Sequence, residues 1–532
     1  MIITVFDARR IQTYLFGSNR LAENIGASYL VNQALHEWPL EAALQTAPGQ
    51  VNPSAANQPI ALPGIFENQP FKIELLYSAG GNALFVCKDI DIAKQFATNF
   101  SKILHERVPG LEVACWHHEI KNTAFNLGEE IWNALSGMAK SKNSQLHSAP
   151  FTGAGVTERC ASGNEETAVF LDTTRSNRFL GPAAFAKIEN KSKAKNHLTD
   201  FLHQEIPNDC DLPSELDDLG RSRGEKSFVG VVHIDGNGIG KSLQAMMRKQ
   251  DTKSHADRLK AIRDYSTAIS DMGSKAVRSV MEQVSHNWDP HERKYAKRLL
   301  IGWDSNSQKM YLPFRPLVYG GDDITFVCDG RIAMDLAVTC LKAFNNIELN
   351  LHACAGIALV KSHYPFFRAY RLAEELCRNA KKAVIEHRSG VGSAMDWQIV
   401  SGGPMRSIDS LREREYTTQV NKLTCRPYFV LPKTDKGMND WESFRNDLLL
   451  VIQGEKLTDQ SKKWAGAHSR LKSLSPHLVR GPDFAQPVLA QWKQKGYELP
   501  KYCSNDLATG FYGNQTPFLD ALELLDFLVP IE

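Results

Sequence analysis

The chain has 532 residues, 42% of them hydrophobic, which is too long for one hydrophobic core and indicates three or four domains. The formal net charge is +2, which excludes the strongly basic surface field typical of many nucleic-acid-binding proteins. No apolar run is long enough to cross a membrane, and the N-terminus lacks the basic-then-apolar order of a signal peptide. We therefore expect a cytoplasmic protein with no membrane partner.

The ten cysteines contain no Cys-x-x-Cys pair, and several lie in apolar segments, where a free cysteine behaves as a small hydrophobic residue. This pattern argues against a disulfide framework and against a structural zinc site.

Residues 1–120 form the first predicted domain. We predict a strand at 2–6, a helix at 10–38 broken near Gly17 and Gly26, and an exposed loop at 46–70 rich in Ala, Pro, Asn and Gln. Residues 71–87 consist of two apolar runs around Gly80-Gly81, which predicts a β-hairpin. A helix at 92–107 and a strand at 111–116 follow.

Residues 121–224 are predicted to be a helical and linker region. It holds helices at 124–139 and 183–205, a surface loop at 141–144 and an acidic linker at 209–218.

Residues 225–405 begin with a near-continuous apolar run at 228–234, the pattern of a buried central strand. The strand ends at Asp235, and a Gly-rich turn through Gly236, Asn237, Gly238 and Gly240 leads into a helix with Lys241 in its first turn. Backbone N–H groups in such a turn can hold phosphate oxygens, helped by the helix dipole.

The same region continues with a long helical insertion, strongest at 264–284, and then a second Gly-Gly hairpin at 314–328. A helix at 332–346, a strand at 351–360 and a helix at 366–387 complete the order β, helices, β-hairpin, helix, β, helix. This order is close to the ferredoxin-like β-α-β-β-α-β plan, which is also found in the palm of polymerases and nucleotide cyclases.

The second hairpin carries Gly320-Gly321-Asp322-Asp323 at its turn. Adjacent ionised carboxylates repel each other, and proteins commonly supply a cation to balance them. On these four residues alone, a solvated turn is an equally good interpretation, because Gly-Asp turns are common. If the two strands are neighbours, however, Asp235 meets Asp322 and Asp323 at one sheet edge. Three carboxylates, with the Gly236 carbonyl, then predict a two-metal site for Mg²⁺ or Mn²⁺ that binds a triphosphate.

The first domain repeats this order, and Gly80-Gly81-Asn82-Ala83 stands where the Gly-Gly-Asp-Asp turn stands in the later domain. Asn and Ala cannot balance two divalent cations, so we expect no metal chemistry in the first copy. Coincidence is the alternative, because the ferredoxin-like order is common.

Residues 406–532 are predicted to be a helical C-terminal domain, because apolar residues recur there at helical spacing. Among the side candidates, His117 and His118 are adjacent on a strand and should point to opposite faces. His233 shares a face with Asp235, and we interpret it as a core residue.

The region of about 225–405 resembles the second palm domain of the large polymerase/cyclase subunit of type III CRISPR complexes. It is more distantly similar to GGDEF-type diguanylate cyclases. The opening of the chain resembles the first, degenerate palm of the same family, through residues 7–12 and 26–28. No HD nuclease motif is found near the N-terminus, so we expect a version without that domain. The residues that carry the match are Asp235 to Gly240, Gly320 to Asp323, Ala355 to Lys361, Ala373 to Leu376, Ala380 and Lys381.

The resemblance implies an α+β fold with two ferredoxin-like palm domains, the first degenerate, plus helical domains. It implies synthesis of cyclic oligoadenylate, or a related cyclic nucleotide, from ATP in antiviral defence. Lys381 is then expected to meet the triphosphate, with Lys382 and Lys241 as alternatives. Ser78, Gly80, Gly81 and Asn82 are expected to lie on the acceptor-nucleotide side. The implied partners are nucleoside triphosphates, RNA or CRISPR-type proteins, and an effector that senses the product. Two alternatives stay open: a silent nucleotide-binding scaffold, and a synthase of linear oligonucleotides or cyclic dinucleotides.

Overall fold

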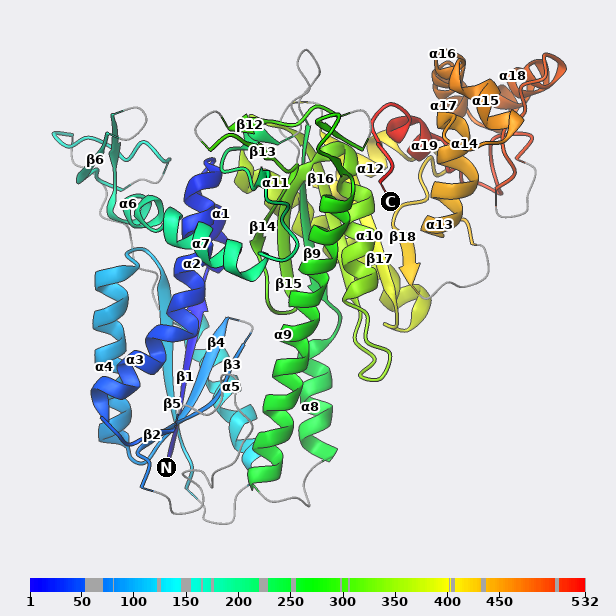
Figure 1. The fold of residues 1–532 in the computed structure, drawn as a ribbon. Helices are drawn as coiled ribbons and strands as arrows, with labels where there is room; N and C mark the ends of the chain where they lie inside the picture. Colours follow the sequence, from blue (N-terminus) through cyan, green and yellow to red (C-terminus); the bar gives the residue numbers. More distant parts are fainter. Residues whose placement is uncertain are drawn as a thin grey trace.

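The computed structural model contains two mixed β-sheet domains joined by helices, with a helical C-terminal region beyond the second sheet (Figure 1). It describes residues 1–52, 70–79, 81–121, 126–144, 155–163, 166–173, 177–219, 228–249, 255–296, 299–304, 307–400, 402, 407–431, 437–502 and 507–531. Gly80 and most of the predicted 46–70 loop lie outside these residues.

The first sheet has the strand order β2-β3-β4-β1-β5. Its four long strands reproduce the ferredoxin-like order, with β1 at the centre and antiparallel to both neighbours. Alternate residues of β1 face opposite layers: Phe6 packs on Phe96 and Phe100 of α4, while Ile3 and Val5 pack on α5. The strands are β1 (Ile2–Arg9), β2 (Val51–Asn52), β3 (Ile73–Ala79), β4 (Asn82–Cys87) and β5 (Glu112–Glu119), with helices α4 (Ile90–Arg107) and α5 (Leu127–Ser144).

The predicted helix at 10–38 is three helices: α1 (Ile11–Phe16), α2 (Leu21–Leu35) and α3 (Glu37–Thr46). The break near Gly17 is confirmed, but the break near Gly26 is wrong. Gly26 lies inside α2, where a Cβ would stand 1.8 Å from the carbonyl oxygen of Lys187. This glycine therefore permits close packing of α2 on α6 (Pro182–Glu189) instead of ending the helix.

The second sheet has the order β14-β15-β9-β16-β17-β18, and its first four strands repeat the ferredoxin-like arrangement. One face, with Val232 and Ile234, packs on the core of helices α9 and α10. The other face, with Val229 and Val231, packs on α11. The strands are β9 (Phe228–Gly236), β14 (Phe314–Val318), β15 (Asp323–Asp329), β16 (Ala353–Lys361), β17 (Ser393–Val400) and β18 (Tyr428–Leu431), with helices α10 (Ala333–Ala343) and α11 (Phe366–Arg388).

The predicted insertion after Asp235 is α8 (Ile239–Lys249) followed by α9 (His255–His286), a long helix that runs past both domains (Figure 1). Small sheets follow it, and one of them pairs β13 with β8. The predicted linker at 209–218 therefore contributes a strand to a sheet, which corrects that prediction. These strands are β8 (Cys210–Asp211), β10 (Trp288–Asp289), β11 (Lys294–Tyr295), β12 (Trp303–Asp304) and β13 (Lys309–Tyr311), and η2 spans Leu216–Asp218.

The region between the two sheets contains the hairpin β6 (Phe170–Asp172) and β7 (Arg178–Leu180), then α6 and α7 (Lys191–Phe201). The predicted loop at 141–144 is wrong, because α5 continues to Ser144. Lys142, in that last turn, forms an ion pair with Asp7, 2.6 Å between Nζ and Oδ2. A contact distant in sequence thus holds a turn that its polar composition predicts to be a loop.

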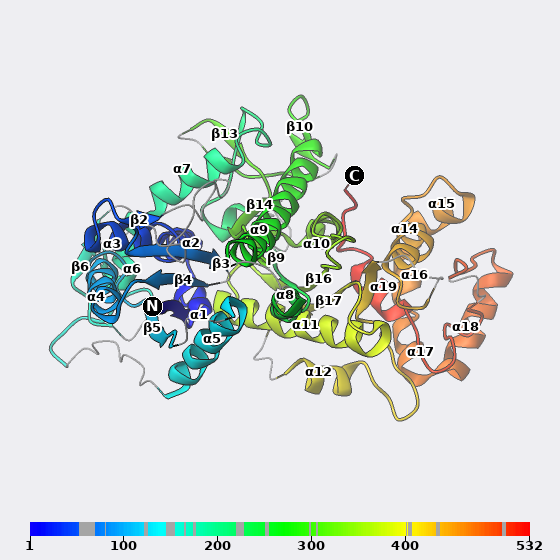
Figure 2. The same ribbon diagram turned by 90° about the horizontal axis from the view of Figure 1, so that it is seen from below.

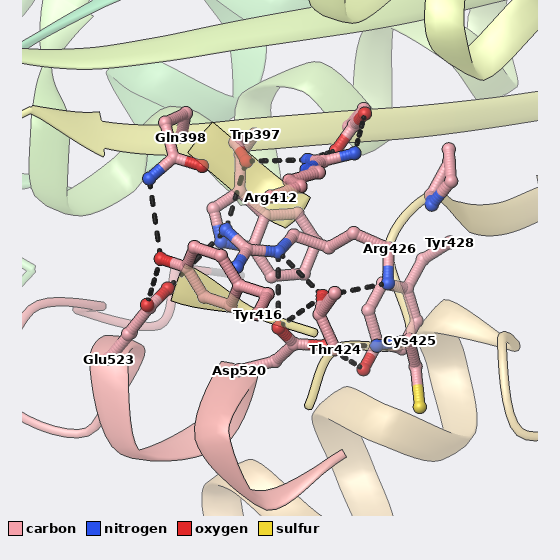
Figure 3. A network of polar contacts seen from close by, with 12 residues as sticks. Trp397, Gln398, Arg412, Tyr416, Thr424, Cys425, Arg426, Tyr428, Asp520 and Glu523 are labelled. Atoms are coloured by element: carbon pink, nitrogen blue, oxygen red, sulfur yellow. Dashed lines mark hydrogen bonds and ion pairs between the residues drawn. The ribbon is translucent and has the colours of Figure 1, made fainter. Parts of the chain in front are cut away.

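The predicted helical C-terminal region is confirmed, and its helices cluster beside the second sheet (Figure 2). The buried Arg426 joins the two, with its guanidinium 3.1 Å from the buried Asp520 carboxylate and donating to the backbone oxygen of Trp397 (Figure 3). The elements are α12 (Ile408–Glu415), α13 (Trp441–Ser443), η4 (Phe444–Leu449), α14 (Leu450–Gln453), α15 (Asp459–Ala465), α16 (His468–Lys472), α17 (Ser475–Arg480), α18 (Pro482–Gln494) and α19 (Phe518–Leu524), and η3 (Gly330–Ile332) precedes α10.

No helix in the described part of the chain is both long and apolar enough to cross a membrane.

Candidate active site

Asp235 and Asp323 face each other across the two central strands of the second sheet. They are direct register partners in the antiparallel pair of β9 and β15. The backbone N–H of Gly236 donates to the carbonyl oxygen of Asp322 at 3.0 Å, which fixes the turn beside the end of β9. The structure thus brings the three predicted carboxylates to one end of two neighbouring strands.

Lys381 is the lysine at this point. Its Nζ lies 2.6 Å from Oδ2 of Asp235 and donates to the carbonyl oxygen of Gly236 at 2.7 Å. Lys382, one residue later on α11, is exposed and lies 3.9 Å from Glu386 on its own helix. Lys241 is exposed near the start of α8. Of the three candidate lysines, Lys381 is therefore the one that contacts the carboxylates.

Asp323 stands among acidic neighbours. Enclosure by protein raises the pKa of its carboxyl to about 8, and repulsion from Asp235, Asp322 and Glu374 adds to this effect. Burial followed by repulsion from Asp235 also raises the pKa of Asp322. Asp323 nonetheless keeps 37% of its side-chain surface open, because it faces a cavity. With a pKa of about 8, the Asp323 carboxyl keeps its proton near pH 7 unless a cation offsets the burial and the repulsion from its neighbours.

His233 contacts the site from inside the sheet. Its Nδ1 lies 3.3 Å from Oδ1 of Asp323 and 3.2 Å from the hydroxyl of Thr325. Burial lowers the pKa of His233 to about 4, so the ring is neutral near pH 7 and does not offset the carboxylates. His233 is buried as predicted, and it also supports Asp323.

A cavity of about 430 Å³ opens in front of these groups, between the two domains. Its walls come from α1 and α2 of the first domain and from the turn and α11 of the second. Gly81 lines it on the first side, and Gly320 and Gly321 line it on the second. Ser78 is engaged elsewhere: its hydroxyl donates to the carbonyl oxygen of Leu35 at 2.7 Å and lies 3.0 Å from Nδ1 of His36.

The Gly-rich turn after β9 forms as predicted, with Gly238 at a positive φ of 68° just before α8 begins. Asn237 is engaged with other loops: its side-chain amide donates to the carbonyl oxygen of Gly392 at 2.9 Å, and its backbone N–H donates to the backbone carbonyl oxygen of His352 at 2.7 Å. Asn237 therefore ties the turn to neighbouring loops. Gly240, in the first turn of α8, has open space where a Cβ would stand.

The chemistry of these groups fits Mg²⁺ or Mn²⁺, because the donors are carboxylate and carbonyl oxygens. Oδ1 of Asp323 is buried and accepts no hydrogen bond, although Nδ1 of His233 lies 3.3 Å away, so this atom can accept a cation. Within the described residues, however, no three His, Cys, Asp or Glu side chains converge closely enough to hold one ion. The carboxylates are adjacent but do not converge, and the ammonium of Lys381 contacts Asp235 and the carbonyl oxygen of Gly236.

The first domain repeats this geometry with other residues. Asp7 faces Asn82 across β1 and β4, and the N–H of Ala8 donates to the carbonyl oxygen of Gly81 at 3.0 Å. By these two contacts Asn82 corresponds to Asp323 and Gly81 to Asp322. The predicted correspondence, Gly81 with Gly321 and Asn82 with Asp322, is therefore wrong by one residue. The loss of charge is confirmed, because a neutral Asn82 stands opposite Asp7.

Several residues of the cavity escaped the sequence analysis. Tyr370, Glu374 and Cys377 line it together with Lys381, at helical spacing on one face of α11. That spacing was a usable signal. Gln12 of the first domain also reaches the site, with Nε2 3.5 Å from Oδ2 of Asp323. Because Gln12 comes from the other domain, no pattern near it in the sequence predicts this contact.

His117 and His118 point to opposite faces of β5, as predicted. His117 lies 3.0 Å from the Thr4 hydroxyl, and His118 lies 2.5 Å from the Glu130 carboxylate.

Comparisons with known proteins agree with this geometry. Residues 228–389 match the family model of the Cas10/Cmr2 second palm domain. No curated protein matches the chain. The crystal structure of Csm1 in T.onnurineus is 14% identical with a TM-score of 0.55, and the alignment covers 98% of this chain and 69% of that one.

Two further structures are Csm1-Csm4 cassettes. The one in complex with one ATP is 13% identical with a TM-score of 0.53, covering 98% of this chain and 70% of that chain. The one in complex with cA3 is 12% identical with a TM-score of 0.52, covering 98% and 69%. The predicted resemblance to the type III CRISPR large subunit and the predicted fold are confirmed.

Proposed function

We propose that this Cas10-like chain is a metal-dependent nucleotidyltransferase that makes cyclic oligoadenylate, or a related cyclic nucleotide, from ATP. The register of Asp235 opposite Asp323, with Lys381 in contact with Asp235 and a cavity in front, carries the proposal. The cavity opens between two palm-like domains, so two nucleotides can approach each other from opposite walls. The neighbouring Csm1 structures in complex with ATP and with cA3 support the same substrate and product class.

In this proposal the hydroxyl of one ribose loses its proton and attacks the α-phosphorus of a second ATP. A new P–O bond forms to the ribose oxygen, the bond between the α-phosphorus and the bridging oxygen to the β-phosphate breaks, and pyrophosphate leaves. Two Mg²⁺ or Mn²⁺ ions held by Asp235, Asp322, Asp323 and the Gly236 carbonyl would activate the hydroxyl and neutralise the leaving pyrophosphate. When the free ribose hydroxyl of the growing oligonucleotide attacks the α-phosphorus at its own triphosphate end, the same step closes the ring.

The protein's own groups position the nucleotides. Gly320 and Gly321 leave the turn without side chains beside the cavity, so a triphosphate can approach the backbone. The backbone N–H groups of Gly236 and Asn237 already donate to Asp322 and His352, so we assign phosphate binding to the N–H groups from Gly238 to Gly240 at the start of α8. Lys381 lies close enough to turn toward a triphosphate. Gly81, on the opposite wall, belongs to the acceptor side, whereas the hydroxyl of Ser78 must leave Leu35 to take part.

The cellular setting is part of the proposal. The neighbouring structures include Csm1-Csm4 cassettes, which supports CRISPR-type protein partners for this chain. RNA as a trigger is a further part of the proposal. We propose a cytoplasmic role in antiviral defence, with an effector that senses the cyclic product.

Mass spectrometry of products after incubation with ATP and Mg²⁺ or Mn²⁺, then with each other nucleotide, tests the function. We expect a cyclic oligoadenylate that disappears in Asp322→Ala/Asp323→Ala and persists in Lys382→Ala, a matched change on the exposed side of α11. Retained synthesis in the double variant would refute the proposed site. Linear products or a cyclic dinucleotide would revise the product.

A silent nucleotide-binding scaffold is the second candidate. The observation in its favour is that the carboxylates do not converge and Lys381 already contacts Asp235. ATP binding without product, also in the presence of CRISPR-type partners and target RNA, would favour it.

A further inference from the structure

The ammonium of Lys381 occupies the position of a cation. It lies 2.6 Å from Oδ2 of Asp235 and 2.7 Å from the carbonyl oxygen of Gly236. These are two of the oxygens assigned above to a divalent ion. An ammonium and an ion cannot share them, because both need the same close approach. In the nucleotide-free protein, Lys381 and a metal ion therefore compete.

The first domain contains the same arrangement, built independently. Nζ of Lys142 lies 2.6 Å from Oδ2 of Asp7 and 3.4 Å from the carbonyl oxygen of Ala8. Lys142 comes from α5, which follows β5, just as Lys381 comes from α11, which follows β16. In both domains the lysine bridges the carboxylate at the end of the central strand and the next carbonyl.

The backbone around the two lysine positions is also equivalent. Asp7 lies four residues before the start of α1 at Ile11, and Asp235 lies four residues before the start of α8 at Ile239. The residue before each helix has a positive φ: 52° at Arg10 and 68° at Gly238. Because two different sequences reach the same contacts, the lysine position belongs to the fold and is not a chance side-chain placement.

The two sites differ in charge. In the first domain the ammonium of Lys142 balances Asp7, and the facing residue is the neutral Asn82. In the second domain Lys381 contacts Asp235 beside Asp322 and Asp323, and these three carboxylates, once ionised, exceed the charge of one ammonium. A divalent ion can offset that excess and an ammonium cannot. Exchange of lysine for metal is thus favoured only in the second domain.

We propose that Lys381 is an internal cation that holds the metal position of the nucleotide-free second domain and is released into the cavity when a divalent ion binds. Lys142 is its permanent counterpart in the first domain. Lys381 is a positioning residue in this role, because it keeps the carboxylates together until the ion arrives and is then free to turn toward a triphosphate. The inference rests on the proposed function only in taking this position as the metal site.

The proposal is tested by measuring the affinity of the full chain for Mn²⁺ in the absence of nucleotide. Calorimetry and the electron spin-resonance signal of free Mn²⁺ both report this affinity. Lys381→Met removes the charge and keeps the length of the side chain, so Mn²⁺ should bind about tenfold more tightly than to the natural chain. The matched control Lys382→Met should leave the affinity unchanged. Unchanged or weaker binding by Lys381→Met would overturn the proposal.

Two further variants provide controls for this test. Lys381→Gln should tighten Mn²⁺ binding in the same direction if Lys381→Met fails to fold. Adding Asp235→Asn to Lys381→Met should abolish the gain, because it removes the oxygen for which lysine and metal compete. A gain that survives Asp235→Asn would place the ion elsewhere and contradict the proposal.

The first domain supplies a second, independent test. Lys142→Met alone should add no Mn²⁺ site, because Asp7 is left with only the neutral Asn82 opposite it. Lys142→Met with Asn82→Asp should add one site, since it recreates two facing carboxylates beside the Ala8 carbonyl. An unchanged number of bound ions in that double variant, when it is folded by circular dichroism, would overturn the proposed role of Lys142.

These measurements separate the inference from the proposed function. Tighter Mn²⁺ binding by Lys381→Met, with no product formed from any nucleotide, would keep the inference and reject the enzyme. Product formation with unchanged Mn²⁺ affinity in Lys381→Met would do the reverse. Absence of Mn²⁺ binding by every variant would reject the metal position itself, and the inference with it.

Discussion

Gly273 on α9 lies directly against Gly321 in the turn that carries Asp322. A Cβ at position 273 would stand 2.2 Å from the carbonyl oxygen of Gly321 and 2.7 Å from its nitrogen. Helix propensity alone predicts that Gly273→Ala stabilises α9 by about 1 kcal/mol. The contact predicts that the same substitution lowers activity, because either α9 or the turn that carries Asp322 must move to make room for the Cβ.

We expect Gly273→Ala to lower nucleotide product formation by about 100-fold, the effect of an ångström-scale displacement of catalytic groups. It should also weaken Mn²⁺ binding. Ser270→Ala, an exposed change one turn earlier on α9, is the matched control and should leave both unchanged. Full activity in Gly273→Ala would show that the turn tolerates the shift.

The sequence was most informative where local pattern decides structure. The apolar runs and Gly-Gly turns predicted both hairpins, and Asp235 at a strand end predicted its meeting with Asp323. Contacts distant in sequence decided the rest. The turn of α5 with Lys142 has a loop-like composition, yet Asp7 holds it as helix. Gly26 has the pattern of a helix break, yet it accommodates the Lys187 carbonyl.

The correspondence between the two hairpins failed for a similar reason. Matching one Gly-Gly pair to the other is a local comparison, whereas equivalence is set by pairing with β1 and β9. That pairing matches Asn82 to Asp323, one residue from the position that the glycines suggest. Gln12 lies in the stretch 7–12 that carries the resemblance, but its contact with Asp323 was not predicted, and neither was that of Gly273 with Gly321, because nothing near them in the sequence records the partner across the fold.

Asp323→Asn should stabilise the protein when metal is removed. In the folded chain the Asp323 carboxyl is held near Asp235, Asp322 and Glu374, and an uncharged amide of the same size relieves the repulsion. With EDTA present, we expect the Tm to rise by about 2–4 °C, the shift that about 1 kcal/mol produces in a domain of 150–250 residues.

Mg²⁺ should have the opposite dependence: it should raise the Tm of the natural chain more than that of Asp323→Asn, because the ion loses a carboxylate ligand. Thermal unfolding followed by circular dichroism, with and without Mg²⁺, measures both effects. A Tm that falls in Asp323→Asn under EDTA would mean that the carboxylate makes a net favourable contact in the metal-free fold.

Lys187 should make stability depend on pH above about 8. Its ammonium is buried against α1 of the first domain and donates to the carbonyl oxygen of Tyr14 at 2.6 Å, and burial lowers its pKa to about 8 despite the nearby Glu23 and Glu166. The unfolded chain has the ordinary value of 10.5. Between pH 8 and 10.5 the unfolded state therefore binds more protons, and stability rises with pH.

Lys187→Met should remove this rise. The measurement is the Tm as a function of pH from 7 to 10.5, compared between the natural chain, Lys187→Met and Lys193→Met, an exposed change on α7. As the pH increases, we expect the Tm of the natural chain and of Lys193→Met to rise relative to the Tm of Lys187→Met. Parallel curves for all three would show that Lys187 does not titrate in this range.

Asp520→Ala should destabilise the C-terminal region strongly. The Arg426 guanidinium and the Asp520 carboxylate are both fully buried and 3.1 Å apart, and Asp520 also accepts from Thr424, the Cys425 backbone and Tyr428 (Figure 3). Removing the carboxylate leaves a buried positive charge with only Glu523 beside it, 3.3 Å away. Loss of one partner of a buried pair costs about 3–5 kcal/mol.

Asp526→Ala is the matched control, because Asp526 is half-exposed and pairs with Lys472 at the surface, where an ion pair contributes about 0–1 kcal/mol. Urea unfolding followed by tryptophan fluorescence measures the difference, because Trp397 lies against the Arg426 guanidinium and reports on the pair. A similar small effect of both variants would mean that Glu523 alone satisfies Arg426. A large effect of Asp520→Ala would identify this buried pair as the main electrostatic link between the second sheet and the C-terminal helices.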